Sequence, residues 1–100
     1  MSIYTSKPQQ RLLRTLDLLF GHEVHGLSLT QIAKLVGTTL PNSTRDLSNL
    51  QEAGYAEQIE GTSNWRIAPR VGQRALAILH TLDRETRRLD EIKNRFTRTN

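Results

Sequence analysis

The sequence predicts a mainly α-helical fold that contains one small β-hairpin and ends in a long helix. Leucines recur at three- and four-residue spacing over most of the 100 residues, which is the period of an amphipathic helix. The period changes to two only from Tyr55 to Glu60, which is typical of a strand. No proline follows Pro69, and the helical period continues from there towards the C-terminus.

The first expected helix covers residues 7–20. Ser6 is followed three residues later by Gln9, as in a capping box, and Pro8 suits the first turn of a helix. Leucines at helical spacing form an apolar face, and Gly21 is the expected stop.

A short strand and a short helix are expected after a polar loop at residues 21–26. Residues 27–29 are predicted to form the strand. Thr30 is the predicted N-cap of the second helix, because threonine is a favoured capping residue, and Gly37 ends this helix.

The third expected helix covers residues 41–53 and opens with Pro41. Leu47 and Leu50 mark its apolar face, which Thr44 and Ala53 extend. The opposite face is polar and almost uncharged, and we expect it to carry Asn42, Ser43, Arg45, Asp46 and Asn49.

The alternation that starts at Tyr55 predicts a hairpin over residues 55–68, with its turn at residues 61–64. Pro69 then opens a helix over residues 69–97, which would be roughly 40 Å long. Its apolar residues fall at the first and fourth positions of a heptad repeat that Glu85 interrupts. These residues are Ala75, Ile78, Leu82, Leu89, Ile92 and Phe96.

A short helix, a tight turn and a longer polar-faced helix make a helix-turn-helix, and a hairpin directly after it makes a winged helix. We therefore expect residues 7–68 to form a winged helix-turn-helix core. Residues 69–97 are expected to form a long C-terminal helix that acts as a dimerisation element through Leu82, Leu89, Ile92 and Phe96. The alternative is that this apolar stripe folds back over the first helix of the same chain.

The charge of the chain favours a polyanionic partner only weakly. Lysine and arginine number 14 against 10 aspartates and glutamates, which gives a net charge of +4. Residues 66–100 hold nine basic and four acidic residues, whereas residues 1–65 hold five and six. The basic surplus therefore lies outside the helix-turn-helix.

Several classes of function are not expected. The absence of cysteine excludes disulfides, thiolate metal sites and cysteine nucleophiles. His22 and His25 lie three residues apart, which is not the H-E-x-x-H spacing of a zinc site. We expect no catalytic residues, metal, cofactor or small-molecule substrate. No apolar run reaches the ~18 residues of a membrane span, and no signal peptide precedes the domain, so a cytoplasmic protein is expected.

Four segments resemble the DNA-binding domain of IclR-type transcriptional regulators. Residues 11–19 resemble the opening helix of that family, and residues 26–33 resemble its Gly-Leu-Ser-Leu-Thr-Glu-Ile-Ala segment. Residues 50–55, Leu-Gln-Glu-Ala-Gly-Tyr, resemble its Leu-Glu-Glu-Leu-Gly-Tyr. Residues 65–71, Trp-Arg-Ile-Ala-Pro-Arg-Val, resemble Tyr-Arg-Leu-Gly-Pro-Arg-Leu, which closes the wing and opens the next helix.

The resemblance implies a transcriptional regulator that binds double-stranded DNA through helix 41–53 in the major groove, with the hairpin 55–68 as a wing.

Two features depart from the family. The turn reads Thr38-Thr39-Leu40-Pro41-Asn42-Ser43-Thr44, where the family has Gly-Leu-Pro-x-Ser-Thr-Val. Members of the family also carry an effector-binding domain after this module, whereas this chain is expected to be a stand-alone form, so ligand sensing is not carried over from the family.

The predicted DNA contacts lie on the third helix, on the turn before it and at the exit of the hairpin. They are Thr38, Thr39, Asn42, Ser43, Arg45, Asn49, Arg66 and Arg70. An arginine at position 45 can pair with guanine, and the asparagines can pair with adenine. The hydroxyl groups suit either phosphate contact or helix capping, and Arg70 suits either a phosphate or a structural carboxylate.

An alternative function is a winged-helix module for protein interaction within a larger assembly. The polar face of the third helix carries a single arginine, and Asp46 opposes phosphate unless it pairs with Arg45 or accepts a hydrogen bond from a cytosine amine.

Overall fold

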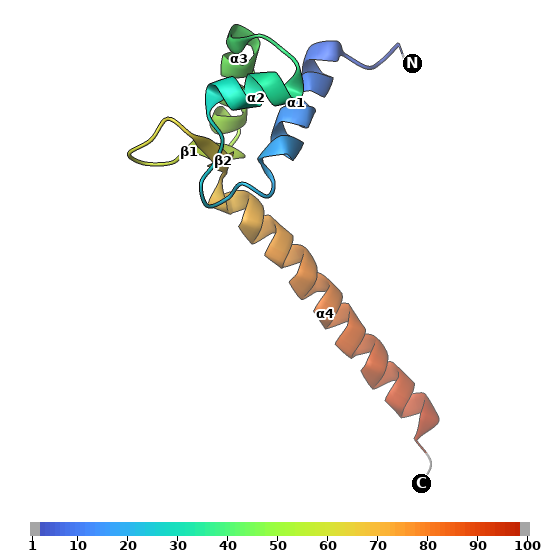
Figure 1. Cartoon of the computed structure of the whole chain (residues 1–100). Helices are drawn as coiled ribbons and strands as arrows, with labels where there is room; N and C mark the ends of the chain where they lie inside the picture. The colour runs from blue at the N-terminus through green and yellow to red at the C-terminus, as the bar shows by residue number, and fades with distance from the viewer. Residues whose placement is uncertain (1–2, 99–100) are drawn as a thin grey trace. The chain divides into compact units, whose positions relative to one another are not determined.

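The computed structural model describes residues 3–98 and confirms the mainly α-helical fold with one hairpin (Figure 1). It is a winged helix-turn-helix followed by a long helix. The elements are α1 (Lys7–Leu19), α2 (Leu29–Val36), α3 (Leu40–Glu52), β1 (Ala56–Gln58), β2 (Trp65–Ile67) and α4 (Pro69–Thr97).

The start of α2 differs from the sequence prediction. Its N-cap is Ser28, not Thr30, because Ser28 and Gln31 form a complete capping box. The Ser28 hydroxyl accepts a hydrogen bond from the Gln31 N–H, and the Gln31 side chain accepts one from the Ser28 N–H. The helix therefore begins at Leu29, and the strand predicted at residues 27–29 is reduced to Leu27.

The hairpin is antiparallel and shorter than predicted, with three residues in each strand. Ala56 pairs with Ile67, and Gln58 pairs with Trp65. Leu27 lies on the other edge of β2, where its N–H and carbonyl both bond to Trp65 at 2.9 and 2.8 Å. This bridge anchors the hairpin to the segment that leads into α2.

The core lies where α1, α2 and α3 contact one another, with the hairpin against α1 and α3. Most of the side chains that fill it are aliphatic, and Trp65 is the one aromatic residue among them within residues 3–98. Its fully or largely buried members include Leu19, Leu27, Ile32, Leu47, Leu50, Trp65 and Ile67. This packing fixes α3 between the other two helices and the hairpin.

The chain divides into two compact units after Arg70. The second unit consists of α4 from Val71 onward, and no residue of α4 is buried. None of the helices within residues 3–98 is both long and apolar enough to span a membrane.

Candidate nucleic-acid interface

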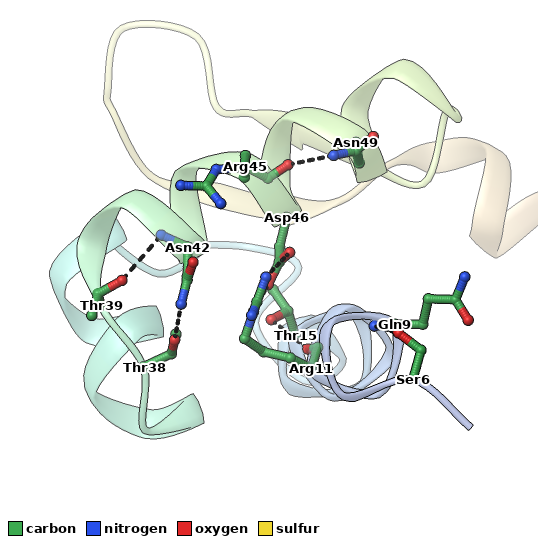
Figure 2. A network of polar contacts seen from close by, with 10 residues as sticks. All are labelled: Ser6, Gln9, Arg11, Thr15, Thr38, Thr39, Asn42, Arg45, Asp46 and Asn49. Carbon is green, nitrogen blue, oxygen red and sulfur yellow. Dashed lines mark hydrogen bonds and ion pairs between the residues drawn. The ribbon is translucent and has the colours of Figure 1, made fainter. Parts of the chain in front are cut away.

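A capping network fixes the turn between α2 and α3. Gly37 ends α2 in the left-handed conformation with φ of 82°, which glycine adopts without steric cost. Thr39 caps α3, and its hydroxyl accepts a hydrogen bond from the Asn42 N–H at 3.3 Å. The Asn42 side-chain amide donates to the Thr38 hydroxyl at 3.0 Å (Figure 2). Three of the predicted DNA contacts thus bond to one another at the start of α3. The helix begins at Leu40, one residue before the predicted start at Pro41.

Asp46 is paired with Arg11 rather than with Arg45. Its two carboxylate oxygens accept hydrogen bonds from Arg11 Nε at 2.7 Å and from an Arg11 terminal nitrogen at 3.0 Å. The Asp46 side chain is 7% exposed, and the Arg11 side chain is 18% exposed. The hydrogen bond to Asp46 raises the pKa of the Arg11 guanidinium above its ordinary value, although burial acts in the opposite direction. This bidentate pair ties α1 to α3.

The outward face of α3 carries Thr44, Arg45, Ser48 and Asn49, all of which are exposed. The Asn49 amide donates to the Arg45 carbonyl at 2.8 Å. No hydrogen bond or ion pair involves the Arg45 guanidinium anywhere in residues 3–98, and no dashed line reaches it in Figure 2. Of the predicted base-reading side chains, Arg45 is therefore the one with no competing partner inside the described chain.

Three residues of α3 lie on faces that the sequence did not predict, and one of them is Asp46, which was expected on the outward polar face but is buried against Arg11. Ser43 is fully buried, so its hydroxyl has no surface for a phosphate contact, and its oxygen has no hydrogen-bond partner among the described residues. Thr44, predicted to extend the apolar face, is exposed instead. Ser48 is an exposed polar residue that sequence reasoning missed. Its position three residues after Arg45 is the helical spacing that could have shown it.

An open groove of about 530 Å³ lies between the start of α1 and the outward face of α3. Polar side chains from both helices line it, and the Arg11–Asp46 pair forms part of its wall. The lining residues are Pro8, Gln9, Arg11, Leu12, Asn42, Arg45, Asp46 and Asn49. Gln9 and Arg11 are thus brought beside three of the predicted DNA contacts from 30 or more residues away in sequence.

The two arginines predicted at the exit of the hairpin both have partners within the chain. Arg66 pairs with Glu57 across the hairpin at 2.8 Å, and both side chains are about one-third exposed. Arg70 donates to the Ala53 carbonyl at the end of α3, and its guanidinium lies 5.3 Å from the centre of the Tyr55 ring. Its structural partners are therefore a carbonyl and an aromatic ring, rather than a carboxylate.

The apolar residues predicted for dimerisation all lie on α4 and are exposed. The exposed fractions are 58% for Leu82, 66% for Leu89, 40% for Ile92 and 87% for Phe96. A single helix from Pro69 to Thr97 carries them, with Glu85 between Leu82 and Leu89.

The part of the chain that the structure describes holds no group of three or more histidine, aspartate or glutamate side chains arranged to bind a metal ion. His22 and His25 lie in the exposed loop between α1 and α2.

Comparison with known proteins identifies the family. The model of the IclR helix-turn-helix domain matches residues 10–60. Similar solved structures include a protein from Silicibacter sp. TM1040 that is described as an IclR transcriptional regulator. The two chains are 29% identical, the match covers 81% of this chain and 32% of that one, and the TM-score is 0.65. HmgR from Pseudomonas aeruginosa has 25% identity over 76% of this chain and 30% of its own, with a TM-score of 0.58.

An IclR family transcriptional regulator from Brucella abortus shares the fold, with 21% identity, 82% and 31% coverage of the two chains and a TM-score of 0.66. The chain spans about a third of the length of these three solved proteins. No curated protein matches the chain. Because the family model covers half of the chain, from within α1 to the end of β1, the chain belongs to the IclR helix-turn-helix domain family.

Proposed function

We propose that the chain binds double-stranded DNA as the DNA-reading part of a transcriptional regulator. In this proposal α3 enters the major groove and the β1–β2 hairpin acts as the wing. Membership of a helix-turn-helix family supports the class of partner, and the similar structure with 29% identity is described as a transcriptional regulator. In helix-turn-helix proteins the second helix of the motif presents its N-terminal side chains to base edges.

The observation that carries the proposal is the separation of charge on α3. Asp46 would repel phosphate, but its carboxylate is buried and is neutralised by Arg11. Arg45 is exposed one residue earlier and has no partner in the described chain. Between Leu40 and Asn49 the outward face of α3 therefore carries Arg45 as its one charge, and Glu52 is exposed only at the far end of the helix. This distribution of charge weakens the reason for regarding the start of α3 as a protein-interaction surface.

The proposed contacts have different roles. Arg45 pairs with guanine through two hydrogen bonds. Asn42 and Asn49 each already use one side-chain N–H, in bonds to the Thr38 hydroxyl and to the Arg45 carbonyl, which fixes the direction of the amide, so we treat them as secondary base contacts.

The remaining proposed contacts go to the phosphate backbone. Thr38 and Thr39 offer hydroxyl groups beside the start of α3, and Arg66 and Arg70 offer guanidinium groups at the exit of the wing. Because all four already have partners in the chain, we expect each to add less to the free energy of binding than Arg45.

We further propose that the regulator is a homodimer that associates through the stripe Leu82, Leu89, Ile92 and Phe96. A two-fold dimer can place two copies of α3 in successive major grooves, about 34 Å apart along B-DNA. The exposure of all four side chains supports this role.

A salt titration of binding to a random-sequence duplex tests the proposed function. For a protein that neutralises phosphates, the logarithm of the binding constant falls linearly with the logarithm of the salt concentration. We expect measurable binding at ~50 mM salt and a steep loss by ~200 mM. A folded chain that shows no binding at ~50 mM salt contradicts the proposal and favours the protein-interaction alternative.

A further inference from the structure

The apolar stripe of α4 is arranged as a heptad repeat with one charged interruption. Ala75, Leu82 and Leu89 occupy the first heptad position, a, and Ile78 and Ile92 occupy the fourth, d. Glu85 occupies the d position in the middle of the stripe. No residue of α4 is buried, and the apolar side chains of the stripe are exposed on the helix.

A parallel pair of these helices would bring like charges together. In a parallel coiled coil each core residue meets its own copy, so Glu85 would face the carboxylate of the second Glu85. The flanking positions would also place Arg88 of one helix near Lys93 of the other. Like charges in direct opposition destabilise a helix pair.

An antiparallel pair offsets the two Glu85 carboxylates by about three residues of helix, roughly 4.5 Å along the axis, so that they no longer face each other directly. Each a position then meets a d position, which puts Ile78 opposite Leu89 and the small Ala75 opposite Ile92. Glu85 faces the apolar Leu82 of the second helix instead of another carboxylate.

The flanking residues also favour the antiparallel register. Leu79, which is 56% exposed, meets Thr86, and Arg88 meets Thr81 instead of a lysine. The remaining like-charge pair is Arg74 with Arg95, near the ends of the helices, where salt and water screen it.

We propose that a second copy of this chain covers the stripe in the antiparallel orientation, with Leu82 of each helix opposite Glu85 of the other. The inference rests on the dimer of the proposed function and adds its orientation and register. In this register Val71 lies opposite Phe96, so the two copies of Val71 are 25 residues of helix apart. That separation is about 38 Å, which is close to one turn of B-DNA at ~34 Å.

Disulfide trapping tests the orientation, because the chain contains no cysteine of its own. A tagged Ile78→Cys chain is mixed with an untagged Leu89→Cys chain and oxidised, and the products are separated by mass. Facing core positions of a helix pair lie within the ~4.4–6.8 Å between Cα atoms that a disulfide needs.

A tagged Leu82→Cys chain mixed with an untagged Glu85→Cys chain repeats the test at the centre. A Gln73→Cys chain mixed with an Asn94→Cys chain is the matched control, since these residues share the register but lie on the outer face of α4.

The expected result is a dominant crosslink between the two different chains in both test mixtures, and little crosslinking in the control. Crosslinks that join like chains, two Ile78→Cys chains to each other or two Leu89→Cys chains to each other, would establish a parallel pair and overturn the proposal. A monomer by light scattering, with no crosslink in any mixture, would overturn both the orientation and the dimer. Either of these results leaves DNA binding by α3 to be decided separately by the salt titration.

Discussion

Asp46 in α3 accepts two hydrogen bonds from the guanidinium of Arg11 in α1, at 2.7 and 3.0 Å. The two residues lie 35 positions apart in sequence. A bidentate arginine–carboxylate pair fixes both distance and orientation. The pair therefore sets how α3 is held against α1 and removes a negative charge from the face proposed to meet DNA.

Replacing either member of this pair is expected to destabilise the fold. Arg11→Ala leaves a largely buried carboxylate without its partner, and Asp46→Ala leaves a guanidinium without its acceptor. The double variant Arg11→Ala/Asp46→Ala is expected to lose less stability than the sum of the two single variants. Urea unfolding followed by circular dichroism measures all three free energies. Arg14→Ala, an exposed arginine one turn further along α1, is the control. Strict additivity of the two single changes would contradict a coupled pair.

The capping box of α2 gives a second expected outcome. Ser28→Ala removes the acceptor for the Gln31 N–H and should cost about 1 kcal/mol of unfolding free energy. Thr30→Ala, two residues later, makes the same kind of change at an exposed position and should cost less than ~0.5 kcal/mol. Thermal or chemical unfolding separates the two variants. A larger loss for Thr30→Ala would mean that the helix begins where the sequence pattern placed it.

Gly26 is expected to tolerate no side chain. A Cβ atom at this position would lie 2.6 Å from the Trp65 carbonyl oxygen and 2.9 Å from the end of the Ile59 side chain. Its φ of 69° is also in the region that favours glycine. Gly21→Ala is the matched control, because Gly21 has a φ of 93° but nothing within 4 Å of the added Cβ.

The control isolates the backbone strain, which is about 1–2 kcal/mol. Gly26→Ala should cost clearly more in unfolding free energy, because it also disturbs the Leu27–Trp65 bridge. Equal losses for the two variants would show that the contact with Trp65 does not constrain this position.

Ser43→Ala should leave stability unchanged or raise it. The buried hydroxyl has no hydrogen-bond partner among residues 3–98, so its removal ends a desolvation cost of about 1–3 kcal/mol per unsatisfied group. Leu47→Ala, at a fully buried position one turn later, should instead cost about 2–5 kcal/mol. DNA affinity measured on the Ser43→Ala variant should match that of the parent chain. A loss of affinity without a loss of stability would return Ser43 to the set of DNA contacts.

Local signals in the sequence were sufficient for the order and type of the four helices and the hairpin, but not for the strand predicted at residues 27–29. Gly37 and Pro69 mark an end and a beginning of helices where the structure has them, and the change of period at Tyr55 marks the hairpin. Local signals could not decide which side of α3 is buried. Ser43 and Thr44 lie four and three residues before Leu47, so both positions fit the apolar face, and contacts with other elements select Ser43.

The partner of Asp46 could not be predicted from local sequence signals either, because it depends on how the helices pack. The sequence pattern offered Arg45 as a neighbouring partner, but adjacent residues on a helix point in different directions. The actual partner, Arg11, is reached only through the packing of α1 on α3. Sequence reasoning therefore found the helix that carries the candidate interface, whereas the charges it displays required the tertiary structure.

The central claim is that α3 reads DNA through Arg45. The most direct measurement compares Arg45→Ala with Arg87→Ala, an equal loss of charge on α4, on a duplex selected from a random pool by the parent chain. Arg45→Ala is expected to weaken binding to that duplex by about 1–3 kcal/mol and to relax the preference at one guanine, whereas Arg87→Ala should keep the preference. An unchanged affinity and base preference in the Arg45→Ala variant would contradict the claim.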